Sequence, residues 1–128
     1  MTSLDKWAPQ ALALLRIVAA LLFIAHGTGK LLGFPDLGFR PGLFSLFGLA
    51  GVIEIAGGIL LILGLFTRPV AFILSGEMAV AYFMAHAPNG FFPVLNQGES
   101  AVLFCFIFLF LVFAGAGAWS LDGKRSAA

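Results

Sequence analysis

Charged residues are scarce in this chain. Only 10% of its 128 residues are Asp, Glu, Lys or Arg, whereas an ordinary soluble domain carries about 25%. A globule this small leaves much of its surface in contact with the surrounding medium, and so few polar side chains cannot cover that surface in water. The composition excludes soluble and disordered classes and predicts a protein whose main partner is the lipid bilayer.

Cysteines and basic clusters are also scarce. Cys105 is the single cysteine and lies in an apolar run, which excludes thiol–disulfide exchange by this chain alone. The sequence shows no metal-ligand constellation and no dinucleotide fingerprint, so we expect no metal site. The seven Lys and Arg residues are scattered rather than gathered in a stripe, so we expect no nucleic-acid partner.

Long apolar runs are what the chain does contain. A helix needs about 20 mostly apolar residues to cross the hydrocarbon core of a bilayer. Four such stretches, separated by Gly, Pro and polar residues, are found near 9–32, 44–66, 69–86 and 100–119. They predict an all-α protein, an integral-membrane four-helix bundle formed by a single domain over residues 1–128.

The basic residues near the span ends predict the orientation of the bundle. The side with both termini has Lys6, Arg68, Lys124 and Arg125, and the other side has Lys30 and Arg40. Because Lys and Arg collect on the cytoplasmic side of membrane proteins, we expect the N- and C-termini to be cytoplasmic.

Ionisable residues inside the predicted spans are the candidate functional residues. A charge near the middle of the bilayer costs about 3 kcal/mol or more unless it is paired or hydrated. Near the middle of the first three spans lie Arg16, Glu54 and Glu77, and toward the outer end lie His26, Lys30, His86 and Glu99. All of them are candidates for ligand binding or for a proton relay.

The first span places its three polar residues on one face. At about 100° per residue, Lys30 lies about 40° from Arg16, and His26 lies about 40° further on. One interpretation is structural, with Arg16 paired to Glu54 or Glu77 as a buried clamp that fixes helix register. The other is functional, with these residues forming a polar network around a ligand.

Glycines accompany the carboxylate of the second span. Gly51, Glu54 and Gly58 share one stripe of the expected helix, and small residues allow two helices to approach closely. The pattern predicts a packed helix interface around Glu54.

A cavity that uses both carboxylates and histidines needs an irregular third span. On an ideal helix His86 falls about 180° from Glu77, so that a pocket with both residues requires a distortion near Ala85. Such a cavity, with polar groups beside an apolar floor, suits a quinone head group, whose carbonyls accept hydrogen bonds and gain protons on reduction.

The polar motifs together resemble a known family. They are Arg16, His26-Gly27-Thr28-Gly29-Lys30, Glu54-Ile55-Ala56-Gly57-Gly58, Gly64-Leu65-Phe66-Thr67-Arg68, Glu77-Met78, Asn96-Gln97-Gly98-Glu99, and Gly115-Ala116-Gly117-Ala118-Trp119-Ser120-Leu121-Asp122. In this order they resemble the DoxX family of small four-helix bacterial membrane proteins, over almost the whole chain.

This resemblance implies an inner-membrane protein in a redox setting. Its superfamily includes methylamine-utilisation membrane proteins, its named members are subunits of an archaeal thiosulfate:quinone oxidoreductase, and other relatives are associated with oxidative or thiol stress. We therefore interpret the chain as a quinone-interacting subunit, not a complete enzyme. In this interpretation Arg16, Glu54 and Glu77 form the central network, and His26 and Lys30 contact the ligand or relay protons.

A non-enzymatic scaffold is the first alternative. It would recruit soluble or membrane redox enzymes through its cytoplasmic face, around Arg68, Asp122, Lys124 and Arg125. The charges inside the membrane would then have a structural role only.

Two further alternatives rank below these. His26 and His86 are expected at one depth and could ligate a b-type haem, although the resemblance does not imply haem. Glu54 and Glu77 could serve as proton sites of a small transporter, which would usually require more spans or a homo-oligomer.

Overall fold

Four long helices form the body of the protein. The computed structural model describes residues 3–38, 42 and 44–127, which contain helices and no β-strand. The long helices are α1 (Ala8–Leu32), α2 (Leu46–Leu63), α3 (Thr67–Ala81) and α5 (Glu99–Ala114), and the short elements are η1 (Asp5–Trp7), the π-helix η2 (Tyr82–His86), η3 (Ala87–Asn89), α4 (Pro93–Asn96) and α6 (Leu121–Ala127). The predicted all-α bundle is confirmed.

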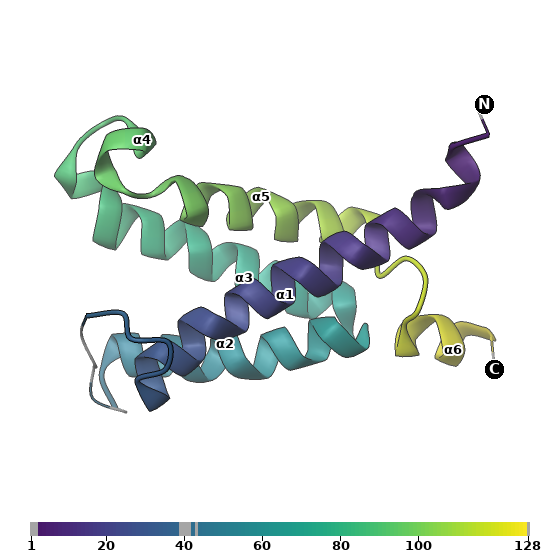
Figure 1. The fold of residues 1–128 in the computed structure, drawn as a ribbon, viewed down its shortest axis with the longest axis horizontal. Helices are drawn as coiled ribbons and strands as arrows, with labels where there is room; N and C mark the ends of the chain where they lie inside the picture. Colours follow the sequence, from purple (N-terminus) through teal and green to yellow (C-terminus); the bar gives the residue numbers. More distant parts are fainter. Residues whose placement is uncertain (1–2, 39–41, 43, 128) are drawn as a thin grey trace.

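The long helices pack as two pairs. Helix α1 packs along α2, and α3 packs along α5, while contacts between α2 and α3 join the pairs (Figure 1). The backbones of α1 and α5 come close at few positions, and the rings of Phe23, Phe104 and Phe108 pack between the two helices. The side of the bundle between α1 and α5 is therefore more open than the side between α2 and α3.

The start of α1 and helix α6 lie at the same end of the bundle (Figure 1). The Ala118 N–H donates to the carbonyl of Pro9 at 3.0 Å, which ties the two segments together. The arrangement agrees with a chain that crosses the membrane an even number of times. The membrane side on which this end lies remains a prediction, and Arg40, one of the two basic residues counted on the opposite side, lies outside the described residues.

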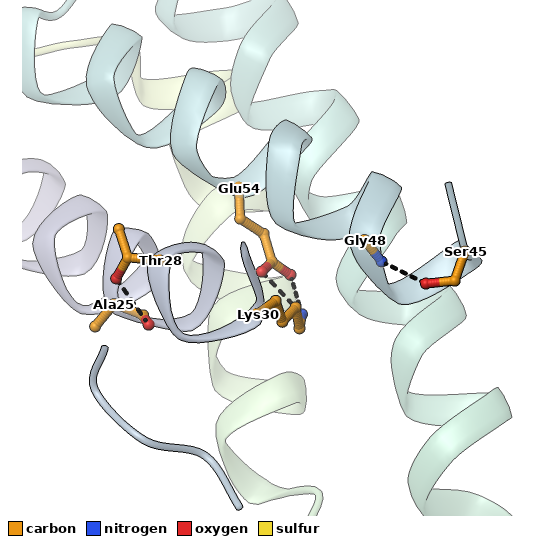
Figure 2. A network of polar contacts seen from close by, with 6 residues as sticks. All are labelled: Ala25, Thr28, Lys30, Ser45, Gly48 and Glu54. Atoms are coloured by element: carbon orange, nitrogen blue, oxygen red, sulfur yellow. Dashed lines mark hydrogen bonds and ion pairs between the residues drawn. The ribbon is translucent and has the colours of Figure 1, made fainter. Parts of the chain in front are cut away.

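Local signals in the sequence explain where the first two long helices begin and end. Pro9 lies in the first turn of α1, where a missing N–H costs nothing. The side chain of Ser45 accepts a hydrogen bond from the Gly48 N–H at 3.1 Å and caps α2 (Figure 2). Both helices end at glycines, Gly33 and Gly64, so the predicted spans 9–32 and 44–66 lie close to α1 and α2.

Glycines let α1 and α2 approach closely. A Cβ atom on Gly27 would lie 2.7 Å from the side chain of Ile55 and 2.8 Å from the carbonyl oxygen of Gly51. Gly51, Glu54 and the neighbouring glycines of α2 are buried. The predicted interface around Glu54 is confirmed.

The fourth predicted span, 100–119, is wrong at its C-terminal end. Helix α5 ends at Ala114, because Gly115 and Gly117 adopt φ of 80° and 76°, a left-handed conformation that glycine tolerates and that stops a helix. The 16 residues of α5 extend about 24 Å, less than the hydrocarbon thickness of about 30 Å. An irregular segment, residues 115–120, follows.

Three helical stretches of the described chain are long and apolar enough to cross a membrane. They are Asp5–Leu32, Leu46–Leu63 and Thr67–Asn89, and α5 is an apolar but shorter helix. Many large apolar side chains on these helices are exposed, which is the pattern of a surface that faces lipid.

Candidate functional site

Arg16 binds backbone carbonyls, not carboxylates. Its side chain is fully buried, and Nε donates to the Leu61 carbonyl at 2.8 Å. Nη1 donates to the carbonyls of Ala116 and Ala118, and Nη2 donates to that of Trp119 at 2.8 Å. The prediction that Arg16 pairs with Glu54 or Glu77 in a central network is therefore wrong.

Distance along α1 explains why Arg16 does not pair with these carboxylates. Lys30 follows Arg16 by 14 residues, which places them about 21 Å apart along the helix axis. The two share a helix face as predicted, but Arg16 lies near the end that carries the irregular segment 115–120. There, carbonyls without helical partners satisfy the guanidinium.

Lys30 and Glu54 form a desolvated ion pair between α1 and α2. Lys30 Nζ lies 2.8 Å from Glu54 Oε1 and 2.7 Å from Oε2 (Figure 2). The side chain of Glu54 is 1% exposed and that of Lys30 is 14% exposed. Each charge thus neutralises the other where a lone charge would be costly.

A polar cavity of about 480 Å³ contains four of the predicted candidates. His26, Lys30, Glu54 and His86 line it, together with apolar side chains and Gln97 and Ser100. Its volume falls in the range of about 300–1,000 Å³ that is typical of small-molecule sites. We call it the polar cavity; it also contains both histidines of the haem hypothesis.

The irregular third span brings His86 to this cavity. Residues Tyr82–His86 form a π-helix, so a distortion near Ala85 is present, but His86 and Glu77 line different cavities and the expected pocket with both residues is not formed. The His86 ring stacks on Tyr82 with centroids 6.4 Å apart, and its Nδ1 lies 3.2 Å from the Asn96 carbonyl.

Sequence reasoning assigned no role to the residues that support His86. Asn96 is buried and donates through Nδ2 to the Tyr82 hydroxyl at 3.2 Å. The signal in the sequence was the chain's single tyrosine, placed in a predicted span. Tyr82 and Asn96 hold the π-helix and α4 together next to His86.

Glu77 and Glu99 lie outside the polar cavity. Glu77 lines a smaller cavity of about 130 Å³, together with Lys30 and Glu54, between α2 and α3. We call this the small cavity. Glu99 is exposed in the first turn of α5 and lines neither cavity. Lys30 and Glu54 therefore line both cavities.

An apolar groove of about 550 Å³ runs along the open side between α1 and α5. Its walls are almost wholly hydrocarbon, and it shares His26, Leu37, Ser100 and Phe104 with the polar cavity. The rings of His26 and Phe104 meet edge to face, with centroids 6.0 Å apart. The groove and the polar cavity therefore join at His26.

Two residues of the expected docking face have contacts within the chain. Arg68 donates to the carbonyls of Val112 and Phe113 at 2.9 and 2.7 Å and so caps α5. Asp122 accepts hydrogen bonds from the backbone N–H groups of Phe66 at 2.8 Å and Thr67 at 2.9 Å, and so caps α3.

The environment of Asp122 favours its charged form. Burial alone would raise the pKa of this carboxyl, but the hydrogen bonds from Thr67 and Phe66 and the charge of Arg125 outweigh burial and lower the pKa. Arg125 itself lies 4.9 Å from the centre of the Phe66 ring. Lys124 and Arg125 are the exposed charges of α6.

Within residues 3–38, 42 and 44–127, no three His, Cys, Asp or Glu side chains are grouped closely enough to hold a metal ion.

Comparison with known proteins places the chain among membrane proteins. The DoxX family model matches residues 11–87. An uncharacterised protein of Haemophilus influenzae is 54% identical over 130 residues, which cover 97% of each chain. An uncharacterised membrane protein of Mycobacterium tuberculosis is 30% identical and covers 92% of this chain and 83% of its own.

The inner membrane protein YphA of Escherichia coli is also 30% identical, over 91% of each chain. No solved structure matches the chain. The family match, these relatives and the apolar helices agree with the expected inner-membrane location. The chain belongs to the DoxX family and is a multi-pass membrane protein.

Proposed function

We propose that this protein binds a membrane quinone and acts as the quinone-interacting subunit of an inner-membrane oxidoreductase system. The observation that carries the proposal is the junction at His26, where an apolar groove between α1 and α5 meets a cavity into whose lining Lys30, Glu54 and His86 bring polar groups. A quinone has the matching shape, since a polar ring is joined to a long apolar tail.

The polar cavity offers hydrogen-bond donors for the quinone carbonyls. An ammonium has three N–H donors, and the two hydrogen bonds from Lys30 to Glu54 leave one free to donate. His26 lies at the entrance, where either ring nitrogen can donate according to its tautomer. A quinone carbonyl placed between these residues would gain a charge-assisted hydrogen bond.

The groove accommodates the tail without desolvation of polar groups. Leu15, Val18, Leu22, Leu103 and Ile107 line it, so an isoprenoid chain there would exchange lipid contacts for protein contacts. The ligand would enter sideways from the bilayer, between α1 and α5, and would not have to cross water.

Electrons would have to come from a partner. The sequence has one cysteine and no dinucleotide fingerprint, so this chain offers no familiar two-electron relay of its own. We therefore assign to this protein the binding and orientation of quinone, and to a soluble or membrane redox enzyme the delivery of electrons.

Quinone binding to the purified protein in nanodiscs tests the proposal. A photoreactive quinone should label residues of α1 and α5 around the groove. His26→Ala should weaken binding by about tenfold, the scale of one lost hydrogen bond of about 1.4 kcal/mol. Glu99→Gln is the matched control, because Glu99 is polar and exposed but lines neither cavity.

A steric pair of variants tests the groove separately. Ala25 lines the groove next to His26, and Ala25→Trp should block the tail. Leu21 is an exposed α1 residue outside the groove, so Leu21→Trp should leave binding unchanged. Folded wild-type protein that takes up no quinone, while it retains a redox enzyme on co-purification, would instead support the scaffold alternative.

A further inference from the structure

Glu77 lies behind the Lys30–Glu54 pair without a donor of its own. Both of its carboxyl oxygens are buried, and neither receives a hydrogen bond from any group in the described part of the chain. Its carboxyl group lines the small cavity together with the side chains of Glu54 and Lys30. If both carboxyl groups were ionised, two negative charges would lie close together and one of them would have no hydrogen-bond donor. Such an arrangement is unstable.

The charges of this cluster balance when it holds one extra proton. Lys30 carries one positive charge and gives two hydrogen bonds to Glu54, which carries one negative charge. A second carboxylate would leave an uncompensated charge inside the membrane, and adjacent carboxyl groups avoid that by sharing a proton. A protonated Glu77 also becomes the donor that its neighbour Glu54 can accept from.

We propose that Glu77 is a neutral carboxylic acid that donates its O–H to Glu54 and serves as the exchangeable proton store of the site. In an exchange, the O–H bond of Glu77 breaks as an O–H bond forms on an oxygen of Glu54 or on a water molecule, and no electron moves. Coupling of this proton to quinone binding rests on the function proposed above, whereas the protonation itself does not.

The small cavity provides the proton with a route of its own. This space of about 130 Å³ between α2 and α3 touches Glu77, Glu54 and Lys30. The rest of its lining is apolar, and a water molecule held between these three side chains would donate to the buried oxygens of Glu77. The proposed ligand reaches the ion pair from the α1–α5 side, and the proton reaches it from the α2–α3 side.

The other titratable groups nearby come from each element packed around Glu77. They are Lys30 and His26 of α1, Glu54 of α2, and Tyr82 and His86 of the π-helix, while α5 contributes Cys105 and Glu99, outside both cavities. Among the described residues that line the small cavity with Glu77, the positive charge is that of Lys30, which Glu54 already neutralises.

Infrared spectroscopy of protein labelled with isotopic glutamate tests the proposal without any ligand. Wild-type protein at neutral pH should show the carbonyl band of a protonated carboxylic acid, shifted by the label. Glu77→Gln should remove the band. In Glu77→Asp the protonated acid is an aspartate, which does not carry the label, so its band should no longer be shifted by labelling. Glu99→Gln should leave the wild-type band unchanged. Lys30→Met should add a second such band, because Glu54 then loses its counter-ion.

The outcomes separate this inference from the proposed function. A wild type without the band, or a band that persists in Glu77→Gln, overturns the proton store even if quinone binds. A band that depends on Glu77, in a protein that binds no quinone, supports the proton store and refutes the quinone site. If Glu77→Gln does not fold, the shift of the band in Glu77→Asp decides the assignment.

Discussion

Removal of the Arg16 guanidinium is expected to release the C-terminal segment. Four carbonyls, those of Leu61, Ala116, Ala118 and Trp119, accept hydrogen bonds from this one side chain. A hydrogen bond to a charged group contributes about 1.5–3 kcal/mol, but these contributions do not add, since the carbonyls of the irregular segment can turn to water once it detaches.

We therefore expect Arg16→Ala to lower the free energy of unfolding by about 3–5 kcal/mol. Arg16→Lys keeps the charge but presents its donors from a single atom, which cannot span four carbonyls, so it should lose about 2–4 kcal/mol. Arg68→Lys is the matched control, because Arg68 also donates to carbonyls but is exposed, and it should lose less than about 1 kcal/mol.

Reversible unfolding in mixed micelles measures these differences. Limited proteolysis is the second readout, since residues 115–120 should become cleavable in the Arg16 variants before the bundle unfolds. An Arg16→Ala protein that remains within about 1 kcal/mol of wild type, with the segment still protected, would refute this reasoning. If the Arg16→Ala variant is stable but loses quinone binding, Arg16 contributes to the ligand site after all.

Three further predictions concern packing, capping and orientation. Gly27→Ala should separate α1 from α2, because its Cβ would meet the Gly51 carbonyl, and should cost about 1–3 kcal/mol in thermal unfolding; Gly76→Ala, which meets nothing within 4 Å, should be neutral or stabilising. Asp122→Ala should cost about 0.5–2 kcal/mol by removal of the α3 cap. Since the folded pKa of Asp122 is lowered, its contribution should be complete above the ordinary carboxyl pKa of about 4 and should fade as pH falls through the folded value, a dependence that Asp122→Asn should abolish. A C-terminal green fluorescent protein fusion should fluoresce and an alkaline phosphatase fusion should be inactive, and the opposite result would place both termini outside the cytoplasm.

The sequence predicted those parts of the fold and site that depend on side-chain pattern. Apolar length located the helices, and the glycines around Glu54 predicted its close packing against α1. Helical geometry predicted that a pocket with both His86 and Glu77 needs a distortion near Ala85; the π-helix at Tyr82–His86 is that distortion, although the two residues line different cavities. In each case the structure depends on residues that are neighbours in the sequence or that recur with the period of the helix.

The parts that depend on backbone geometry could not be predicted in this way. Arg16 was assigned a carboxylate partner because only side chains can be counted in a sequence, yet three of its four acceptors are carbonyls freed where α5 stops at Gly115, and the fourth is the Leu61 carbonyl of α2. The groove between α1 and α5 depends on the angle at which two helices diverge, which no residue pattern encodes.

The Arg16 contacts also bear on how the protein is made. Three of the four acceptors, the carbonyls of Ala116, Ala118 and Trp119, follow the last of the long helices. During synthesis these three acceptors become available to the guanidinium of the first helix only after residues 116–119 have been translated. The region that the DoxX family model matches, residues 11–87, contains the arginine but not these three acceptors. Packing of the first helix is therefore completed by a segment about 100 residues further along the chain, and a chain truncated before residue 116 should be recognised by membrane quality control as unfinished.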